Sequence, residues 1–265
     1  MISVNGVKIE PTIFPDNTSQ VWKLPDSVID FCKDKKVIEI LWEFDNEAEF
    51  MNVVQLKTLL SFLNDEAYFR LHMPYLPYAR QDKHIANDAT FALIPFACLL
   101  EVIFDSIKVF DPHSKEIIES CFGRENVEIV EPADEIAYAV NDCCADMICY
   151  PDKGAAKRYS IGMPKIVLDK TRDQITGNVT GMVIDEEASS VTPSEVNQAH
   201  VLIVDDLCDG GRTFVEAAKI LLEAGADRVF LYISHGLFTR PEGVNYLYDN
   251  GISRVYTKDG FIPSV

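Results

Sequence analysis

The sequence predicts an α/β protein built on mainly parallel sheets that are flanked by helices. Short runs of β-branched and aromatic residues alternate, almost throughout, with longer segments whose apolar residues have helical spacing. This alternation is typical of strand-helix-strand units, whose strands run parallel. The scheme occurs twice along 265 residues, a length that suggests about two domains. A polar stretch at residues 131–134 therefore predicts a boundary between two similar halves.

In the first half, three apolar runs are predicted to be strands. Residues 36–42 (KVIEILW) form the first of them. Residues 48–64 then place apolar side chains three and four positions apart, which predicts a helix. A strand is expected at 67–73 (AYFRLHM), an apolar helix at 90–102 and another strand at 106–111 (SIKVFD).

The second half repeats the scheme with five predicted strands. They are MICYPD at 147–152, KIVLDK at 165–170, VTGMVID at 179–185, HVLIVDD at 200–206 and RVFLYISH at 228–235. Helices are expected near 155–160 and at 213–224, with Gly225 at the C-terminal cap of the second. Because ligands of open parallel sheets bind beyond the carboxyl ends of the strands, we expect functional residues there.

Composition and charge narrow the range of functions. Hydrophobic residues make up 48% of the chain, enough for a full core. The formal net charge of -18 argues against a nucleic-acid partner, because a phosphate backbone requires basic residues. No apolar run of about 18 residues is present, so we expect no membrane span. Seven irregularly spaced cysteines without a CxxC pair indicate reduced thiols, and residues 1–10 lack a signal-peptide pattern; both predict a cytoplasmic protein.

The most informative segment is VLIVDDLCDGGRTF at residues 201–214. Asp205 and Asp206 are adjacent like charges at the end of a buried strand, which carries a desolvation and repulsion cost. Ribose hydroxyls, which donate hydrogen bonds, or a cation would offset that cost. The glycine-rich turn that follows can bring backbone N–H groups together at a helix N-terminus, which favours an anion. The segment therefore predicts a ribose-phosphate site, whereas a single aspartate at a strand end, such as Asp111 or Asp152, more often caps the next helix.

Segments 201–214 and 74–83 resemble motifs of known enzymes. The first resembles the ribose-phosphate loop of the type I phosphoribosyltransferase fold, and PYLPYARQDK at 74–83 resembles the PYxxYARQD signature of the ribose-phosphate pyrophosphokinases, which ordinary transferases lack. Further segments resemble that family in order: FPDNTSQV at 14–21, FDPH at 110–113, PDKGA at 151–155, DKTR at 169–172 and SHG at 234–236. The resemblance implies two tandem type I phosphoribosyltransferase-like domains, residues 1–133 with the ATP-binding motifs and 134–265 with the catalytic and ribose-phosphate loops.

The resemblance implies a Mg²⁺-dependent enzyme that transfers the β,γ-diphosphate of ATP to the C1 hydroxyl of ribose 5-phosphate and releases AMP. It also implies a homo-oligomer, a dimer or a hexamer. The phosphate turn departs from the family, because it reads DGGRT where D-T-A-G-T is usual: Gly210 removes a hydroxyl donor and Arg212 adds a cation. A substituted acceptor such as ADP-ribose, used in NAD salvage, therefore stays open as an alternative to ribose 5-phosphate.

The resemblance assigns roles to residues of four kinds. Residues expected to bind ATP are Phe14, Asp16, Arg80, Gln81, Asp82 and Lys83. His113 and Asp152 are expected beside the metal ion, although Mg²⁺ prefers oxygen ligands. Lys170 and Arg172 are the expected catalytic residues, which supply positive charge to the transferred phosphates. Residues expected to bind the ribose phosphate are Asp205, Asp206, Asp209, Gly210, Gly211, Arg212 and Thr213.

Two other classes of function compete with this one. A phosphoribosyltransferase would consume the pyrophosphate product, and the YARQDK segment at 78–83 argues against it. A non-catalytic subunit is disfavoured by the retention of His113, Asp152, Lys170 and Arg172. A P-loop kinase is disfavoured, because the chain has no G-x-x-x-x-G-K-[ST] pattern.

Overall fold

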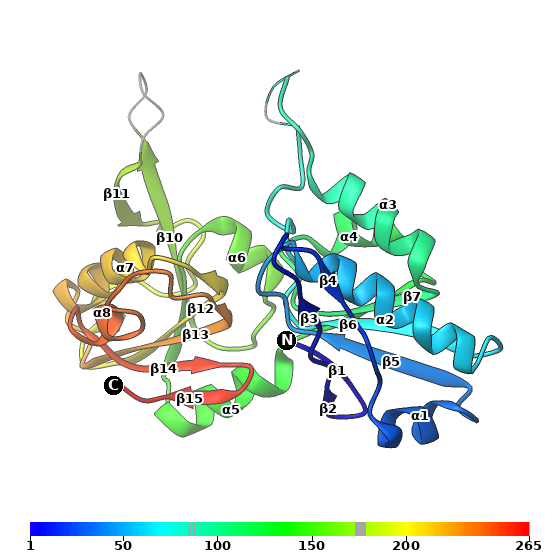
Figure 1. Ribbon diagram of the computed structural model, residues 1–265. Coiled ribbons are helices and arrows are strands. Elements are labelled where there is room, and N and C mark those ends of the chain that lie inside the picture. Colours follow the sequence, from blue (N-terminus) through cyan, green and yellow to red (C-terminus); the bar gives the residue numbers. More distant parts are fainter. Residues whose placement is uncertain (85, 87, 173–178, 265) are drawn as a thin grey trace. The chain divides into compact units, whose positions relative to one another are not determined.

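The chain divides into two compact units, Met1–Glu131 and Pro132–Val265, each built on its own sheet (Figure 1). The structure is a computed structural model that describes residues 1–84, 86, 88–172 and 179–264. It describes their side chains as well, except those of residues 170–172, 179 and 180. The predicted fold class, α/β with mainly parallel sheets flanked by helices, is confirmed.

The first unit contains a six-stranded sheet in the order β2-β1-β5-β6-β7-β8. Its strands are β1 (Ile2–Val4), β2 (Val7–Lys8), β5 (Val37–Trp42), β6 (Tyr68–Met73), β7 (Ser106–Phe110) and β8 (Val127–Val130). Strands β5 to β8 run parallel, and β1 is antiparallel to β2 and to β5. A separate ribbon pairs β3 (Thr12–Ile13) with β4 (Ser19–Gln20). The three strands predicted in this half are confirmed.

The described residues of the first unit include helices α1 (Asp26–Cys32), α2 (Glu49–Leu63), α3 (Leu93–Ile103) and α4 (Lys115–Phe122). Helix α2 buries Val53, Leu56 and Leu60 completely, at the helical spacing seen in the sequence. Helix α3 begins at Leu93, three residues later than predicted, with Ala92 as its N-cap. The carboxyl ends of β5, β6 and β7 lead toward these helices, so the connecting segments occupy one edge of the sheet.

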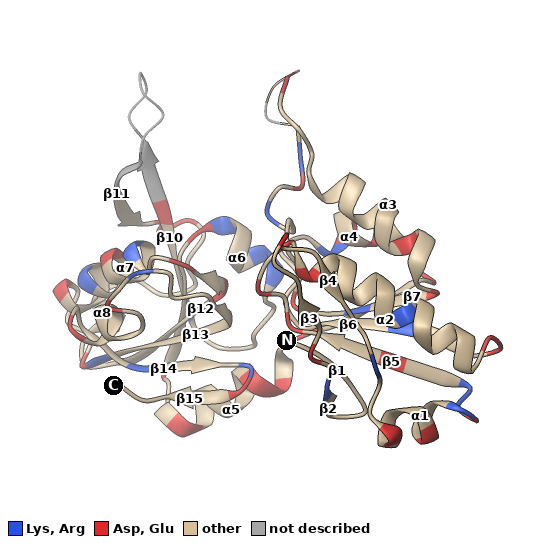
Figure 2. Cartoon of the chain, viewed as in Figure 1, with Lys and Arg blue, Asp and Glu red and all other residues tan. Residues whose placement is uncertain are grey.

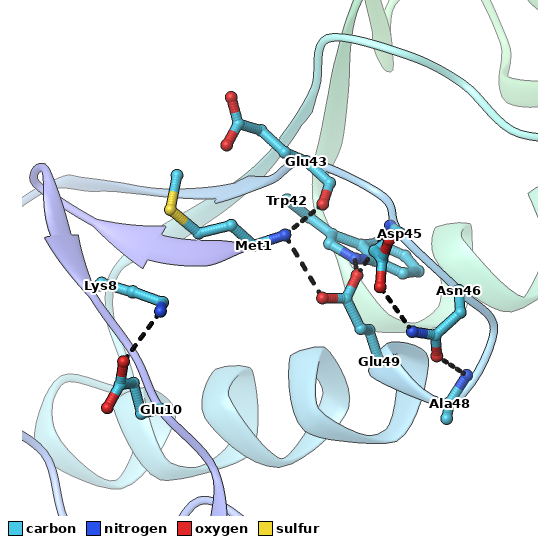
Figure 3. Close-up of polar contacts among 9 residues, drawn as sticks. All are labelled: Met1, Lys8, Glu10, Trp42, Glu43, Asp45, Asn46, Ala48 and Glu49. Carbon is cyan, nitrogen blue, oxygen red and sulfur yellow. Dashed lines mark hydrogen bonds and ion pairs between the residues drawn. The ribbon is translucent and has the colours of Figure 1, made fainter. Parts of the chain in front are cut away.

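The turn from β5 to α2 is fixed by the Glu49 carboxylate (Figure 3). The indole Nε1 of Trp42, a fully buried side chain, donates to Glu49 Oε2 at 2.8 Å. The same oxygen accepts a hydrogen bond from the backbone N–H of Asp45 at 3.0 Å. The other carboxylate oxygen lies 3.3 Å from the amino group of Met1. One acidic side chain thereby holds a strand end, a turn and a helix start together.

The second unit contains a seven-stranded sheet in the order β11-β10-β9-β12-β13-β14-β15. Its strands are β9 (Met147–Tyr150), β10 (Lys165–Arg172), β11 (Val179–Ile184), β12 (His200–Cys208), β13 (Arg228–Gly236), β14 (Ile252–Thr257) and β15 (Gly260–Ile262). The five inner strands run parallel, and the edge strands β11 and β15 are antiparallel to their neighbours. All five strands predicted in this half are confirmed.

The helical segments of the second unit are α5 (Ala133–Cys143), α6 (Lys153–Arg158), the 3-10 turn η1 (Pro193–Val196), α7 (Arg212–Glu223) and α8 (Asn245–Tyr248). Helix α7 ends as expected, with Gly225 in the left-handed region at φ 99°. Within the described residues, no helix has the length and apolar character needed to cross a membrane. The core of the sheet buries Val201, Leu202, Ile203 and Val204 of β12 completely, so β12 is a central strand.

Candidate active site

The carboxyl edge of the second sheet gathers several of the predicted site residues. Strands β9 and β12 are parallel neighbours with Cys149 opposite Ile203. Asp152 and Asp206 each follow this pair by three residues, so both lie at the same edge of the sheet. Asp205 lies opposite Ile233 of β13, the neighbour on the other side. The fold therefore brings Asp152, Asp205 and Asp206 to one edge, as parallel strands require.

The Asp205–Asp206 pair lies within β12 itself, which continues to Cys208. Asp206 is 2% exposed, so its carboxylate has lost nearly all contact with solvent. The side chain of Asp205 is only 13% exposed, and its Oδ1 accepts a hydrogen bond of 2.9 Å from the backbone N–H of Asp206. Two buried acids side by side repel one another and need a compensating group.

Arg158, at the end of α6, supplies that compensation. Its Nη1 lies 3.1 Å from Asp206 Oδ2 and 4.0 Å from Asp205 Oδ1. The sequence reasoning missed this residue, since it considered only ribose hydroxyls or a metal ion as the offset for the two acids. Helix α6 has Asp152 as its N-cap and Arg158 in its last turn. The position of Arg158, six residues after an acid at the end of a strand, is the signal that could have identified this arginine.

The protonation of Asp205 reflects its surroundings. Burial raises the pKa of the Asp205 carboxyl well above its usual value of 3.8, and the neighbouring Asp206 carboxylate raises it further. Arg158 acts in the opposite direction and lowers the pKa, but its effect is the smaller one. A hydrogen-bond donor that approaches Asp205 would therefore stabilise its ionised carboxylate.

The glycine turn after β12 leads directly into helix α7. Gly211 precedes the helix with φ 73° and ψ -8°, a left-handed conformation that glycine adopts without steric cost. A Cβ atom at Gly211 would lie 2.9 Å from Leu247 Cδ2 and 3.3 Å from Tyr246 Cδ1, so a side chain there requires neighbours to move. The first N–H groups of a helix have no partner within the helix and carry partial positive charge, which suits an anion.

Two side chains of this turn have partners that the sequence did not predict. The Nε of Arg212 donates to Glu216 Oε1, one helical turn further along α7, at 3.1 Å. This is an exposed pair, with the Arg212 side chain 77% exposed. The Asp209 Oδ1 atom accepts a hydrogen bond from Thr239 Oγ1. The predicted contact of Arg212 with a phosphate stays a prediction, and in this structure its guanidinium pairs with Glu216.

Asp152 begins helix α6. Its Oδ1 accepts a 3.0 Å hydrogen bond from the backbone N–H of Ala155, which makes Asp152 the N-cap. The next side chain, Lys153, reaches Asp185 Oδ2 at 2.6 Å and Asp169 Oδ2 at 3.7 Å. Figure 2 shows the basic residues of α6 near this edge of the second sheet. The capping interpretation therefore holds for Asp152, and its predicted role beside a metal ion stays a prediction.

The predicted catalytic residues Lys170 and Arg172 lie at the end of β10. Their backbone pairs with β11, Lys170 opposite Met182 and Arg172 opposite Val179. The side chains of both residues lie outside the described part of the chain. The segment DKTR is thus the end of a strand in an antiparallel hairpin, and the role of its two cations stays a prediction.

In the first unit, the 80–83 segment follows β6 and is anchored at Tyr78. The Tyr78 hydroxyl donates to Glu47, and its ring lies 5.0 Å from that of Phe96. This hydrogen bond raises the pKa of Tyr78 to about 12, with burial as the second cause. Arg80, Gln81 and Lys83 are exposed, and Asp82 is 7% exposed. The turn thus presents three long polar side chains outward while Asp82 lies in the interior.

The ribbon formed by β3 and β4 carries Phe14 and Asp16 on its turn. Asp16 Oδ1 accepts hydrogen bonds from the Thr18 hydroxyl at 2.7 Å and from its backbone N–H at 3.0 Å, and these lower the pKa of Asp16. Asn17 adopts φ 65°, which asparagine tolerates better than most residues. Asp16 and Asn17 thus shape the turn, and Phe14 beside them is 37% exposed.

His113, the other predicted metal-linked residue, follows β7 and is half-buried. It lies just after Asp111, which has φ 38°. Across the described ranges, no group of three or more His, Cys, Asp or Glu side chains could hold a metal ion. The predicted role of His113 beside a metal ion stays a prediction.

Comparison with known proteins identifies relatives over nearly the whole chain, although no protein-family model matches it. The chain is 28% identical over 260 residues to the ribose-phosphate pyrophosphokinase of Sulfolobus acidocaldarius, covering 95% of this chain and 84% of that one. It is 29% identical over 242 residues to that of Pyrococcus abyssi, covering 88% and 78%. The crystal structure of phosphoribosylpyrophosphate synthetase from Mycobacterium smegmatis is 21% identical with a TM-score of 0.67, covering 87% of this chain and 78% of that chain, which shows a shared fold.

Proposed function

The chain belongs to the ribose-phosphate pyrophosphokinase family and is an enzyme of that family, and we propose that it transfers the β,γ-diphosphate of ATP as one unit to ribose 5-phosphate. The products are 5-phosphoribosyl 1-pyrophosphate and AMP. The observation that carries the proposal is the buried Asp205–Asp206 pair directly before the glycine turn of α7. The ATP-binding motifs belong to a domain of residues 1–133, and the ribose-phosphate and catalytic segments to a domain of residues 134–265.

The acid pair suits the hydroxyl groups of the acceptor. A ribose presents two neighbouring hydroxyls, and each can donate a hydrogen bond to a carboxylate oxygen. Since burial and mutual repulsion penalise the ionised pair, hydrogen-bond donors from the sugar would stabilise the charged form of the two acids. Arg158 holds the two acids in place from the other side. Asp205 and Asp206 are therefore the proposed ligands of the ribose hydroxyls.

The 5-phosphate of the acceptor binds next to the acids, at the start of α7. Residues Asp209 to Thr213 form the proposed phosphate turn, in which Gly211 allows the backbone to take a left-handed conformation. Backbone N–H groups and the Thr213 hydroxyl are the donors that this turn offers to phosphate oxygens. The two subsites lie next to one another in sequence, as the sugar and phosphate lie next to one another in ribose 5-phosphate.

ATP binds through the residues of the first unit. Arg80, Gln81 and Lys83 are exposed and carry donors for phosphate oxygens, and Asp82 supports their turn from the interior. Phe14 offers an exposed ring for the adenine base, and Asp16 shapes the turn beside it. These roles come from the family resemblance.

The transfer is a displacement at the β-phosphorus. The C1 hydroxyl oxygen forms the new bond to that phosphorus, the bond to the oxygen bridging the α-phosphate breaks, and AMP leaves with that oxygen while the hydroxyl proton goes to solvent. Such reactions depend on positioning and on neutralising developing charge. Lys170 and Arg172 supply that charge in the proposed mechanism. The resemblance assigns His113 and Asp152 to Mg²⁺, which would supply positive charge to the phosphates; the Asp152 carboxylate fits the ion's preference for oxygen better than the His113 imidazole.

The same transfer onto a substituted ribose 5-phosphate such as ADP-ribose is the second candidate. It is favoured by the DGGRT turn, in which Gly210 has no side chain to close the site around a terminal phosphate. An enzyme with that acceptor belongs in NAD salvage. We further propose that the protein acts in the cytoplasm as a homo-oligomer, a dimer or a hexamer.

One assay tests the function. The protein is mixed with Mg-ATP and either ribose 5-phosphate or ADP-ribose, and the nucleotide product is identified by chromatography. AMP that forms only in the presence of an acceptor supports diphosphate transfer, and the productive acceptor decides between the two candidates. ADP as the product, or no turnover with either acceptor, contradicts the proposal.

A further inference from the structure

The loop of residues 237–246 after β13, termed the 237–246 loop, lies directly against the phosphate turn. The backbone N–H groups of Leu237 and Phe238 donate to the carbonyl of Cys208 at 2.8 and 3.4 Å. The Thr239 hydroxyl donates to the carboxylate of Asp209. These bonds tie the start of the loop to the end of β12. The proposed roles of the sequence motifs do not include this loop.

Arg240 is the residue of the loop that reaches the glycines. Its Nε donates to the carbonyl oxygen of Gly210. Its guanidinium carbon lies 4.4 Å from the ring centroid of Tyr246, so the group also stacks on an aromatic face. Two contacts on different sides therefore fix the guanidinium next to the turn, while the residue as a whole is exposed.

Both glycines of the turn make room for the 237–246 loop and for helix α8 (Asn245–Tyr248), which begins within it. A Cβ atom at Gly210 would lie 3.3 Å from Arg240 Nε and 3.8 Å from its Nη2. A Cβ atom at Gly211 would meet Tyr246 and Leu247. Gly210, where the sequence departs from the family, therefore leaves room for Arg240, and a larger residue at position 210 would displace the arginine.

The charge of Arg240 is available to a ligand. Among the described residues, Arg240 contacts a backbone carbonyl and an aromatic ring, and both of these groups are uncharged. The described side chains of Arg158 and Arg212, by contrast, are paired with acids, Arg158 with Asp206 and Arg212 with Glu216. A phosphate that binds beside Asp209 needs a cation to offset the acidic surroundings. Arginine held through Nε keeps its Nη donors for phosphate oxygens.

We infer that Arg240 is a substrate-binding residue that contacts the phosphate of the acceptor at the Gly210–Gly211 turn. The inference rests on the proposed function, because it assigns a residue to the same acceptor site. It places the cation of the phosphate subsite on the 237–246 loop, whereas the sequence pattern alone points to Arg212.

The test compares Arg240→Gln with wild type in the AMP assay, using the productive acceptor. Loss of a charge-assisted hydrogen bond is expected to raise the acceptor KM about tenfold or more, with little change in the ATP KM. Arg228→Gln is the matched control, because Arg228 is an exposed arginine at the opposite end of β13, beside Asp227. It is expected to leave all constants unchanged. An acceptor KM that is equal in Arg240→Gln and wild type overturns the inference.

Gly210→Ala gives an independent check. Its methyl group would lie 3.3 Å from Arg240 Nε, so the guanidinium must shift and the acceptor KM is expected to rise in the same direction. A rise in Gly210→Ala without one in Arg240→Gln assigns the effect to the turn itself and contradicts the inference.

Calorimetric titration with ribose 5-phosphate, without ATP, separates this inference from the proposed function. If wild type forms no AMP with either acceptor, the proposed function fails, and the inference is then decided by binding alone. Weaker binding of ribose 5-phosphate to Arg240→Gln than to wild type and Arg228→Gln supports it. Equal binding to all three, or no binding to wild type, overturns it.

Discussion

The candidate residues of the two units differ in how the protein holds them. In the second unit, Asp205 and Asp206 lie on a central strand, are nearly excluded from solvent and have Arg158 as a partner within 4.0 Å. In the first unit, Arg80, Gln81 and Lys83 are exposed on a turn. A buried charge must be compensated before the ligand arrives, whereas an exposed charge is also stabilised by water. Substitutions in the second unit are therefore expected to change both stability and activity, and those in the first unit activity alone.

Lys170→Ala is expected to have the largest effect. Removing a cation that acts only on the transition state should lower kcat about 10²- to 10³-fold and change the ATP KM little. Steady-state kinetics with varied ATP measures both constants. Lys165→Ala, at the start of the same strand β10, is the control and should retain kcat. A rise in KM at constant kcat would show that Lys170 binds the ground state instead.

Arg80→Ala sharpens the comparison from the first unit. Loss of a charge-assisted hydrogen bond to ATP should raise the ATP KM roughly 10- to 100-fold. Because Arg80 is exposed, the melting temperature should stay close to that of wild type. Arg124→Ala, which removes another exposed arginine of this unit, one paired with Glu119, is the control. A large fall in melting temperature would mean that the 80–83 segment is structural.

Arg158→Met tests the compensation of the acid pair. It leaves two buried carboxylates without their cation, and since the Arg158 side chain is 18% exposed, the expected loss of stability is about 1 to 3 kcal/mol. Urea unfolding measures it. Arg212→Ala removes an exposed pair and should cost less than about 0.5 kcal/mol. Adding Asp206→Asn to Arg158→Met should restore part of the stability. Equal losses for the two arginine variants would contradict the difference between buried and exposed pairs.

The strands that form the candidate site were predictable from the sequence, because the continuous apolar run of β12 leads into two acids. The turn was predictable as well, since Gly211 occupies a position with positive φ before a helix. The partners of these residues were not predictable. Arg158 comes from the end of α6, far along the chain from its partner Asp206. Arg240 comes from the loop after β13. No local sequence pattern marks such contacts.

The short elements were also missed, for a related reason. Strand β15 has three residues and begins at Gly260 with φ 99°. A strand this short has too few alternating positions to show a period of two, so its pairing with a neighbour decides its structure. The partner of Arg212 was missed as well. Its side chain donates to Glu216, four residues further along the surface of α7, a contact that depends on the helix.

Asp205→Asn should produce the smallest effect, a change in how stability depends on pH. Burial and the Asp206 charge raise the pKa of Asp205 above its usual 3.8 in the folded protein. A raised pKa means that the folded state holds a proton more tightly than the unfolded state, so this carboxyl contributes stability below pH 3.8, which is lost as the pH rises through the raised value. Asparagine has no proton to lose there. The melting temperature of wild type, followed by calorimetry from pH 5 to 9, should therefore fall relative to that of Asp205→Asn as the pH rises. Ribose 5-phosphate should reduce the difference if its hydroxyls donate to the ionised pair. Parallel curves for the two proteins would show that the acid pair is already fully compensated by Arg158, and the contrast between the two units would then lose its electrostatic basis.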